Sequence, residues 1–432
     1  MTTTINNEHK KLNVPNKREQ NQTCLDSAER EGLRPKGNVP TLRFPEFQGE
    51  WEELGLSELL DFKNGLNPKP DKFGMGIKFI SVMDILNNAV ITYDCIKASV
   101  DVTEKELADF SVEKGDILFQ RSSETLEDVG RANVYMDDKT AVFGGFVIRG
   151  KKKGEYDPQY FNYLLRSPFA RKRIIPMGAG AQHFNIGQEG LSKVKLHFAN
   201  IEEQKKIGKM LSLLDERIST QNKIIEDLKK LKSAIIENHY NQTEKQTASI
   251  ADLGEPFSVG NLAKDDLTET GMPCVVYGEL FTTYGETISQ IESHTNKITG
   301  MILSKKGDLL FPSSTTVDAM SLIAPSVINV DGVILGGDMF GIHINHNYNA
   351  QYLSYYFNHI AKRQLAKFAK GSTIIHLHYA DIEKAKLLLP SLEEQNRMAK
   401  CIMSLDAKMN IETFFISLLN SQKTHLLRQM FI

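Results

Sequence analysis

Apolar residues recur at alternating spacings of three and four in two long stretches of this sequence, one central and one at the C-terminal end. In the central stretch they are Ile207, Leu211, Leu214, Ile218, Ile225, Leu228 and Ile235. In the C-terminal stretch they are Met398, Ile402, Leu405, Met409, Ile416, Leu419 and Leu426. A period of 3.5 residues predicts a long helix with a coiled-coil seam in each stretch.

Two seam positions are polar in both stretches: Gln221 matches Glu412, and Lys232 matches Lys423. Polar seam residues cost stability but fix the register and the partner of a coiled coil. Either each helix packs on its own domain, or the two helices pack on each other. We favour mutual packing, because both stretches carry the same polar interruptions.

Each stretch also begins with the signals of a helix start. Asn200 stands three residues before Glu203, and Ser391 stands three residues before Glu394. This spacing predicts two capping boxes, in which the first side chain accepts a hydrogen bond from a backbone amide and the glutamate reaches back.

The two helices are the ends of a longer repeat, related by a shift close to 191 positions, from Ile201 to Leu392. Upstream, "FISVMDI" from Phe79 corresponds to "CVVYGEL" from Cys274, and "GDILFQRSS" matches "GDLLFPSST". "FGGF" matches "LGGD", and "KVKLHFANIEEQ" matches "KAKLLLPSLEEQ". The chain is therefore interpreted as a tandem duplication of a mixed domain followed by one long helix.

Within the mixed domains, β-branched and aromatic runs predict strands at residues 77–82, 117–120, 141–148 and 193–198. Residues 158–175 and 350–370 are predicted to be amphipathic helices, each followed by a glycine-containing loop. The fold class is thus α/β, of the mixed α+β type. The predicted boundaries are 1–38 (disordered tail), 39–199 (first mixed domain), 200–240 (central helix), 241–249 (linker), 250–390 (second mixed domain) and 391–432 (distal helix).

Composition limits the class of protein and the compartment that we expect for it. The 432 residues include 41% hydrophobic and 25% charged residues, as in an ordinary soluble protein. No apolar run approaches the roughly 20 residues of a membrane-spanning helix. The four cysteines (Cys24, Cys95, Cys274, Cys401) are far apart, which predicts a reducing cytoplasm rather than a disulfide framework. The net charge of -2 means that any DNA binding must rest on local charge.

Candidate catalytic motifs are weak throughout. No GxGxxG or Walker lysine follows a strand, and His376 and His378 have no evident third metal ligand nearby. The segment Asn67-Pro68-Lys69-Pro70 departs from the Asn-Pro-Pro-aromatic loop of adenine methyltransferases. We therefore expect a non-catalytic chain that itself holds no metal or cofactor.

Basic residues cluster before a glycine loop in both halves: Arg171, Lys172 and Arg173 before Gly180, and Lys362, Arg363, Lys367 and Lys370 before Gly371. Such clusters are often only a solvated helix face, but their recurrence favours phosphate contacts. Polar residues at two strand ends and in the loops are types that can read base edges, although hydrogen-bonded turns would use the same types. These candidates are Gln120, Arg121, Ser122, Ser123, Gln182 and His183, with counterparts Ser313, Ser314, Thr315, Ser372, Thr373 and His376.

The ordered set of motifs resembles the specificity subunit of Type I restriction–modification systems over nearly the whole chain. It comprises "VPTLRFPEFQGEWEE" from Val39, the twice-used strand followed by "EEQ", and the Leu-Asp pair in each helix (Leu214-Asp215 and Leu405-Asp406). The resemblance implies two target-recognition domains that each read half of a bipartite, asymmetric site in double-stranded DNA. It also implies that the long helices form an antiparallel coiled coil with pseudo-twofold symmetry.

Partners follow from the same resemblance. Methyltransferase subunits would supply S-adenosylmethionine and adenine-N6 methylation, and restriction subunits would add ATP- and Mg-dependent translocation and cleavage. Two other interpretations stay open: a free-standing DNA-binding protein or regulator, and an interaction scaffold built on the coiled coil without DNA.

Overall fold

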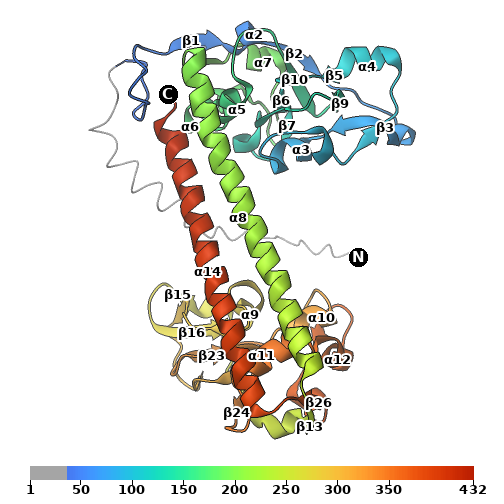
Figure 1. Ribbon diagram of the computed structural model, residues 1–432, viewed down its shortest axis with the longest axis vertical. Helices are drawn as coiled ribbons and strands as arrows, with labels where there is room; N and C mark the ends of the chain where they lie inside the picture. The colour runs from blue at the N-terminus through green and yellow to red at the C-terminus, as the bar shows by residue number, and fades with distance from the viewer. Residues whose placement is uncertain (1–36) are drawn as a thin grey trace, which may run out of the picture. The chain divides into compact units, whose positions relative to one another are not determined.

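The computed structural model describes residues 37–432, and they divide into two compact units. The first unit runs to Thr220 and includes Ile416–Ile432, and the second is Gln221–Phe415. Almost all of the predicted tail, with Cys24, lies outside the described residues. Helices α8 (Ile201–Gln242) and α14 (Leu392–Gln429) each contribute to both units (Figure 1). The compact units divide each long helix between them, whereas the predicted boundaries treat each helix as a segment of its own. The predicted boundaries therefore stay a prediction.

The first unit contains two four-stranded sheets, with strand orders β2-β10-β6-β8 and β4-β3-β9-β5, and an antiparallel pair β1-β12. Its strands are β1 (Glu52–Gly55), β2 (Leu60–Asn64), β3 (Phe73–Ile80), β4 (Ser99–Val100), β5 (Ser111–Val112), β6 (Ile117–Gln120), β7 (Ser122–Ser123), β8 (Ala132–Val134), β9 (Ala141–Phe143), β10 (Val147–Lys152), β11 (Phe184–Asn185) and β12 (Lys195–Phe198). Its shorter helices are α2 (Leu56–Leu59), α3 (Val82–Asn87), α4 (Glu104–Phe110), α5 (Pro158–Arg166), α6 (Pro168–Ile174) and α7 (Gln188–Ser192).

The second unit contains two five-stranded sheets, with orders β14-β24-β20-β22-β17 and β15-β18-β16-β23-β19, and the pair β13-β26. Its strands are β13 (Gln246–Ser249), β14 (Gly254–Ser258), β15 (Leu267–Thr268), β16 (Met272–Val276), β17 (Thr287–Ile288), β18 (Ser293–Thr295), β19 (Ile302–Leu303), β20 (Asp308–Pro312), β21 (Ser314–Thr315), β22 (Ser326–Ile328), β23 (Ile334–Gly336), β24 (Met339–Ile344), β25 (Ile375–His376) and β26 (Lys386–Leu389). Its shorter helices are α9 (Glu279–Thr282), α10 (Ala319–Leu322), α11 (Ala350–His359), α12 (Lys362–Leu365) and α13 (Tyr379–Ile382).

The sheets of the two units repeat one topology. β2-β10-β6-β8 corresponds to β14-β24-β20-β22, and β4-β3-β9-β5 corresponds to β18-β16-β23-β19. One parallel pairing recurs within the second sheet of each unit, between β3 and β9 and between β16 and β23. The structure therefore confirms the mixed fold and the duplication predicted from the sequence.

Three predicted elements are wrong in detail, because each divides into two. Residues 158–175 form α5 and α6 rather than one helix, because Ser167 is extended and caps α6, which begins at Pro168. Proline suits the first turn of a helix but would interrupt the interior of a longer one. Likewise, α11 ends at His359 and α12 begins at Lys362. The predicted strand 141–148 divides into β9 and β10, joined through a turn in which the Val147 amide donates to the Gly144 carbonyl at 2.8 Å.

The opening segment shares one core with the chain's C-terminus in the first unit. Trp51 packs edge-on against Tyr160 of α5 and against Phe431, and all three side chains are buried. The Leu42 amide donates to the Gln429 carbonyl at 2.8 Å. Aromatic side chains of this size each remove about 150–250 Å² from water, which explains how the opening segment is held.

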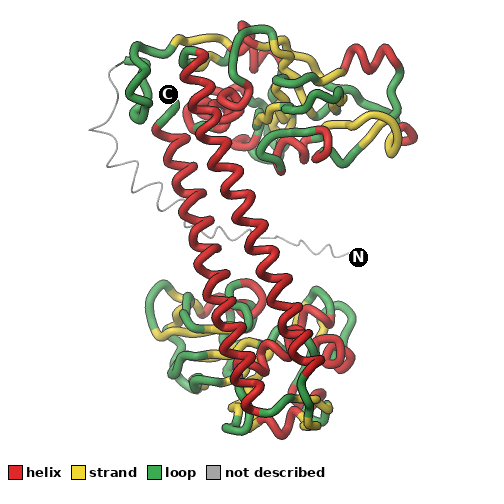
Figure 2. The backbone as a smooth tube through the Cα atoms, viewed as in Figure 1, coloured by secondary structure: helices red, strands yellow, loops and turns green. Residues whose placement is uncertain are grey.

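The long helices pack together within each unit (Figure 2). In the first unit, Asp215 of α8 accepts hydrogen bonds from Lys423 of α14 at 2.5 Å and from the Tyr163 hydroxyl at 2.8 Å. In the second, Asp406 of α14 accepts from Lys232 of α8 at 2.6 Å and from the Tyr355 hydroxyl at 2.7 Å.

These contacts link the start of one helix to the end of the other, so the predicted antiparallel pairing is confirmed. The polar seam residues Gln221 and Glu412 are also hydrogen-bonded to each other. Each Leu-Asp motif therefore joins three elements: its own helix, the other long helix and the helix of a mixed domain.

The helix starts are only partly as predicted. The Glu203 amide donates to the Asn200 side chain at 2.9 Å, and the Glu394 amide donates to Ser391 at 3.3 Å. However, neither glutamate reaches back to complete a capping box. The buried Glu203 carboxylate instead accepts two hydrogen bonds from Arg43, at 2.7 and 2.8 Å, and Glu394 pairs with Arg397 and His239. The second half of the capping-box prediction is wrong, because cationic side chains compete successfully for these carboxylates.

The glutamine of each "EEQ" makes the same two bonds in both units. Gln204 accepts from the Asp157 amide at 3.0 Å and donates to the Ala199 carbonyl at 2.7 Å. Gln395 accepts from the Asn349 amide at 3.0 Å and donates to the Pro390 carbonyl at 2.9 Å. A buried amide thus ties each long helix to the N-cap of a mixed-domain helix, which accounts for the repeat of this residue.

Candidate nucleic-acid interface

In the first unit, the structure brings the predicted strand-end residues and the predicted loop together in a short ribbon. After β6 ends at Gln120, β7 pairs antiparallel with β11, so that Ser122 faces Asn185. The Ile186 amide donates to the Arg121 carbonyl at 2.9 Å, and the Ser122 hydroxyl donates to the Asn185 side chain. Two segments that are about sixty residues apart in sequence therefore form one surface.

The turn before β11 depends on a glycine. Gly180 has φ +147°, and a Cβ atom there would lie 2.0 Å from the His183 carbonyl oxygen. Paired backbone bonds of 2.9 Å between Ala179 and Asn185 close the turn. Only glycine adopts this backbone conformation without strain, so the loop that carries Gln182 and His183 folds back onto β7.

The second unit builds the same ribbon from β21 and β25. Ser314 faces His376, and the Leu377 amide donates to the Ser313 carbonyl at 2.9 Å. Lys370 and His376 exchange backbone bonds of 2.9 and 2.7 Å, and Gly371 has φ +117°. The ribbon frame is thus duplicated, while its side chains differ between the two units.

The predicted base-contacting residues divide by exposure. Gln120 and Ser313 are buried, and the side-chain amide of Gln120 donates to the Ser122 backbone carbonyl at 2.8 Å. Arg121, Ser122, Ser123 and Thr315 are half-buried. Ser314 is buried, and its hydroxyl donates a hydrogen bond to the Asp338 carboxylate. The exposed candidates are Gln182, His183, Ser372, Thr373 and His376.

The basic run of the first unit also divides. Arg171 donates to the backbone carbonyls of Glu127 and Val129 at 2.8 and 2.7 Å, and burial lowers its pKa to about 10. Arg173 pairs with Glu53 at 3.0 Å, whereas Lys172 is exposed. Arg171 therefore supports the turn at residues 126–129, and Lys172 is the member of this run best placed for solvent or DNA.

In the second unit, Arg363 and Lys367 are exposed and Lys362 is half-buried. Lys370 is exposed but pairs with Asp381. The His376 and His378 rings stack with centroids 6.1 Å apart. Among residues 37–432, no group of three or more His, Cys, Asp and Glu side chains could hold a metal ion.

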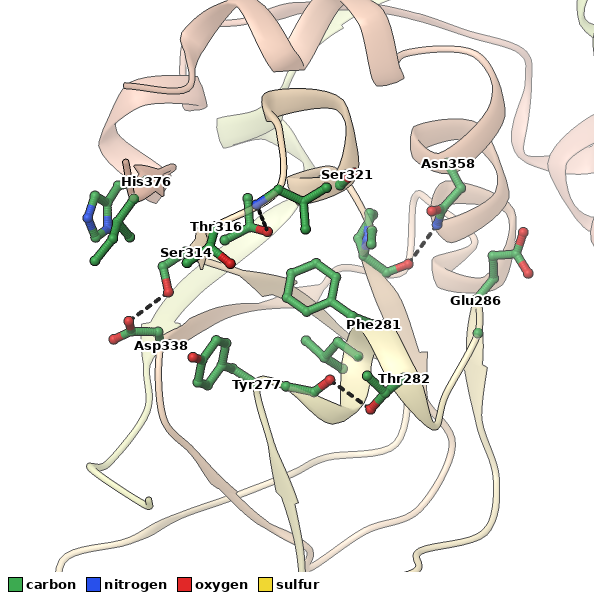
Figure 3. Close-up of a pocket in the computed structure, with 18 residues that line it drawn as sticks. Tyr277, Phe281, Thr282, Glu286, Ser314, Thr316, Ser321, Asp338, Asn358 and His376 are labelled. Carbon is green, nitrogen blue, oxygen red and sulfur yellow. Dashed lines mark hydrogen bonds between the residues drawn. The ribbon is translucent and has the colours of Figure 1, made fainter. Parts of the chain in front are cut away.

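A groove of about 700 Å³ opens beside the ribbon of the second unit. Figure 3 shows the Phe281 ring facing the hollow, with Ser314 and Asp338 hydrogen-bonded on one side. Its labelled lining residues are Tyr277, Phe281, Thr282, Glu286, Ser314, Thr316, Ser321, Asp338, Asn358 and His376. The groove combines an aromatic floor with hydroxyl and carboxylate groups, and three of the predicted site residues (Ser314, Thr315 and His376) line it.

The first unit has a more apolar groove of about 410 Å³, lined mainly by apolar residues that include Phe73, Met83 and Phe146. Phe146 is 69% exposed and Met83 is 60% exposed. Neither Phe146 nor its counterpart Asp338 was singled out from the sequence. The sequence does mark them, because the matched segments "FGGF" and "LGGD" end on these two residues.

Comparisons with known proteins agree with this architecture. The family described as "Type I restriction modification DNA specificity domain" matches residues 48–230 and 243–418. The "putative type I restriction enzyme MjaX specificity subunit" of Methanocaldococcus jannaschii is 24% identical over 398 residues, covering 87% of this chain and 91% of the relative. The "type I restriction enzyme MjaVIII specificity subunit" of the same organism is 23% identical over 398 residues, covering 86% and 89%.

A solved structure shares the fold. The S subunit of a Type I restriction–modification system from M. genitalium superimposes with a TM-score of 0.57 at 17% identity, covering 91% of this chain and 99% of that one. Within residues 37–432, no helix has both the length and the apolar character needed to cross a membrane. The family match spans both repeats, and the resemblance inferred from the sequence is confirmed: the chain belongs to the family of the Type I restriction modification DNA specificity domain.

Proposed function

We propose that this chain reads a bipartite, asymmetric DNA site, one half with each unit, and directs adenine-N6 methylation and restriction by partner subunits. The observation that carries the proposal is the duplicated ribbon. The β7-β11 and β21-β25 pairs share backbone bonds and glycine turns but present different side chains. A common frame with different side chains is what two readers of different sequences require.

Local charge supports DNA binding despite the net charge of -2. Exposed cations lie in the runs before both glycine turns, among them Lys172, Arg363 and Lys367. Exposed cations can neutralise phosphates and release counterions, which supplies affinity without sequence preference. In this proposal these residues position the duplex, and the ribbons and grooves read it.

The long helices are assigned a measuring role. An ion pair joins them within each unit, and both helices are continuous across the boundary between the units. A stiff helix pair fixes a distance better than a flexible linker does. The number of unread base pairs between the two half-sites would then depend on helix length.

The chemistry is assigned to other chains. S-adenosylmethionine would bind to methyltransferase subunits, and ATP and Mg²⁺ to restriction and translocation subunits. This chain would supply the DNA sequence preference and the surface on which those subunits assemble.

The experiment is modified-base mapping of genomic DNA from a host that produces the methyltransferase subunit with or without this chain. We expect N6-methyladenine at a split motif only when the chain is present. Copurification of the chain with the methyltransferase would exclude a free-standing regulator. Unmethylated DNA in both hosts, with no sequence-dependent retention of DNA by the complex, would contradict the proposal.

A further inference from the structure

One residue position beside the ribbon is equivalent in the two units and differs in chemistry. Phe146 follows Gly144-Gly145 after β9, and Asp338 follows Gly336-Gly337 at the end of β23. The Arg121 amide donates to the Phe146 carbonyl at 2.9 Å, and the Ser313 amide donates to the Asp338 carbonyl at 2.7 Å. The same backbone bond therefore places Phe146 beside the end of β6 and Asp338 beside the end of β20.

Asp338 presents a carboxylate in a defined orientation. Its Oδ2 atom accepts a hydrogen bond from the Ser314 hydroxyl at 2.7 Å, at the edge of the groove in Figure 3. The residue is exposed, and no Lys, Arg or His side chain within the described part of the chain forms a salt bridge with it. Oδ1 is thus left to accept a hydrogen bond from outside the protein.

A carboxylate on a DNA-binding surface is repelled by phosphates, so its favourable partner is a hydrogen-bond donor on a base. In the major groove, the exocyclic donors are cytosine N4 and adenine N6. Adenine places the N7 acceptor next to N6, and this acceptor would repel a carboxylate, whereas cytosine presents only the donor. The chemistry of Asp338 therefore selects cytosine.

We propose that Asp338 is a specificity-determining residue that accepts a hydrogen bond from cytosine N4 in the half-site read by the second unit, with Ser314 as its positioning residue. This inference rests on the proposed function. In the first unit, the exposed Phe146 ring offers no hydrogen bond at the equivalent position and suits contact with the thymine methyl group. The asymmetry of the site thus has one of its origins at this position.

The test replaces the carboxylate by an amide of the same shape. The full-length Asp338→Asn chain is co-produced with the methyltransferase subunit of its own host, and its methylation motif is mapped. Asparagine can bond to adenine N6 and N7 together. We expect the preference for cytosine at one position of one half-site to fall by about tenfold or more, in favour of adenine, while the other half-site stays unchanged.

Matched variants separate reading from general charge. Asp265→Asn removes the same charge from an exposed residue of the short 3-10 helix Lys264–Asp266, and it should leave the motif unchanged. Ser314→Ala should relax the same position as Asp338→Asn. Phe146→Ala should relax a position in the other half-site only.

The outcomes are distinguishable. A wild-type split motif that Asp338→Asn leaves unaltered would overturn the inference and leave the proposed function standing. Equal loss of methylation at all sites by an assembled Asp338→Asn complex would also overturn it, because Asp338 would then be a general contact. If the Asp338→Asn chain does not assemble with the methyltransferase, the methylation motifs of Asp338→Ala and Ser314→Ala test the inference instead. A wild-type chain that directs no split motif would contradict the proposed function itself.

Discussion

Arg171 and Lys172 are neighbours in one basic run, but their surroundings give them different roles. The Arg171 guanidinium is partly buried and donates to two backbone carbonyls of the turn at residues 126–129, whereas Lys172 is exposed. A charged donor bonded to backbone carbonyls contributes to stability, and an exposed cation contributes to phosphate binding.

We therefore expect Arg171→Ala to lower the free energy of unfolding by about 1–3 kcal/mol, because two carbonyls lose their donor. Lys172→Ala should leave stability within about 0.5 kcal/mol of the wild type and weaken DNA binding on all sequences, with a smaller salt dependence. Denaturant unfolding and DNA titrations at several salt concentrations measure the two effects. Equal destabilisation by both changes would contradict this division.

Glu286 is a buried-pair carboxylate that we expect to make the second unit sensitive to acid. Burial raises the pKa of its carboxyl group, but the hydrogen bond with His359 and the charge of Lys232 outweigh burial and hold the pKa at about 2. The ordinary value is 4.5. A depressed carboxyl pKa stabilises the fold above the unfolded value, and this stabilisation is lost as the pH falls from about 4.5 towards 2.

Glu286→Gln should therefore show a weaker loss of stability than the wild type between pH 4.5 and pH 2. Thermal unfolding of both proteins across this window, followed by hydrogen exchange at residues of the second unit, measures the difference. Parallel pH profiles of the two proteins would show that Glu286 is not the group responsible.

At the scale of elements, two equivalent lysines fasten the long helices with different degrees of burial. The Lys232 side chain is 6% exposed and contacts both Asp406 and Glu286, whereas the Lys423 side chain is 21% exposed and contacts Asp215. Removing one partner of a buried ion pair is costly, because the remaining charge stays buried without compensation.

Lys232→Met should destabilise the second unit by about 3–5 kcal/mol, since Asp406 and Glu286 both lose the lysine that pairs with them. Lys423→Met is the matched control in the first unit, and it should cost less because water reaches that pair. Calorimetry combined with limited proteolysis would assign each loss to its unit. A larger effect of Lys423→Met would contradict the role of burial.

The hydrophobic pattern was informative for the long helices, because a 3.5-residue period extends over many turns in both copies. It was less informative for residues 158–175, where the apolar positions continue through Ser167 but the backbone does not. The pattern also missed the partner of Glu203: Arg43 is 160 residues away in sequence, and local spacing could not indicate it.

At the scale of the whole molecule, α8 has 42 residues and α14 has 38. At 1.5 Å per residue, helices of this length extend about 60 Å. Our proposal makes this length the ruler for the unread spacer in the DNA. Gln221 and Glu412 contact each other near the middle of the pair, so a change in length has to be made in both helices.

Insertion of one turn of four residues at Gln221 and of one turn at Glu412 adds about 6 Å. The duplex rises 3.4 Å per base pair, so the spacer should lengthen by about one or two base pairs with both half-sequences unchanged. Methylome sequencing measures this directly. Insertion in α8 alone is the control, and it should disrupt the pairing rather than lengthen the spacer. An unchanged spacer in the double insertion would contradict the ruler.

The sequence by itself determined the duplication, the two helices, their seam and their polar interruptions, because periodicity and repetition are properties of the order of residues. It also indicated which strand ends and loops carry polar side chains of the kinds that can contact DNA, and the fold brings those segments together in two ribbons. Only the tertiary structure decided which candidates face inward, such as Gln120 and Arg171, and it brought two residues that were not candidates, Asp338 and Phe146, to the surface. Burial and hydrogen bonding depend on neighbours that are distant in the sequence, and the order of residues alone does not specify them.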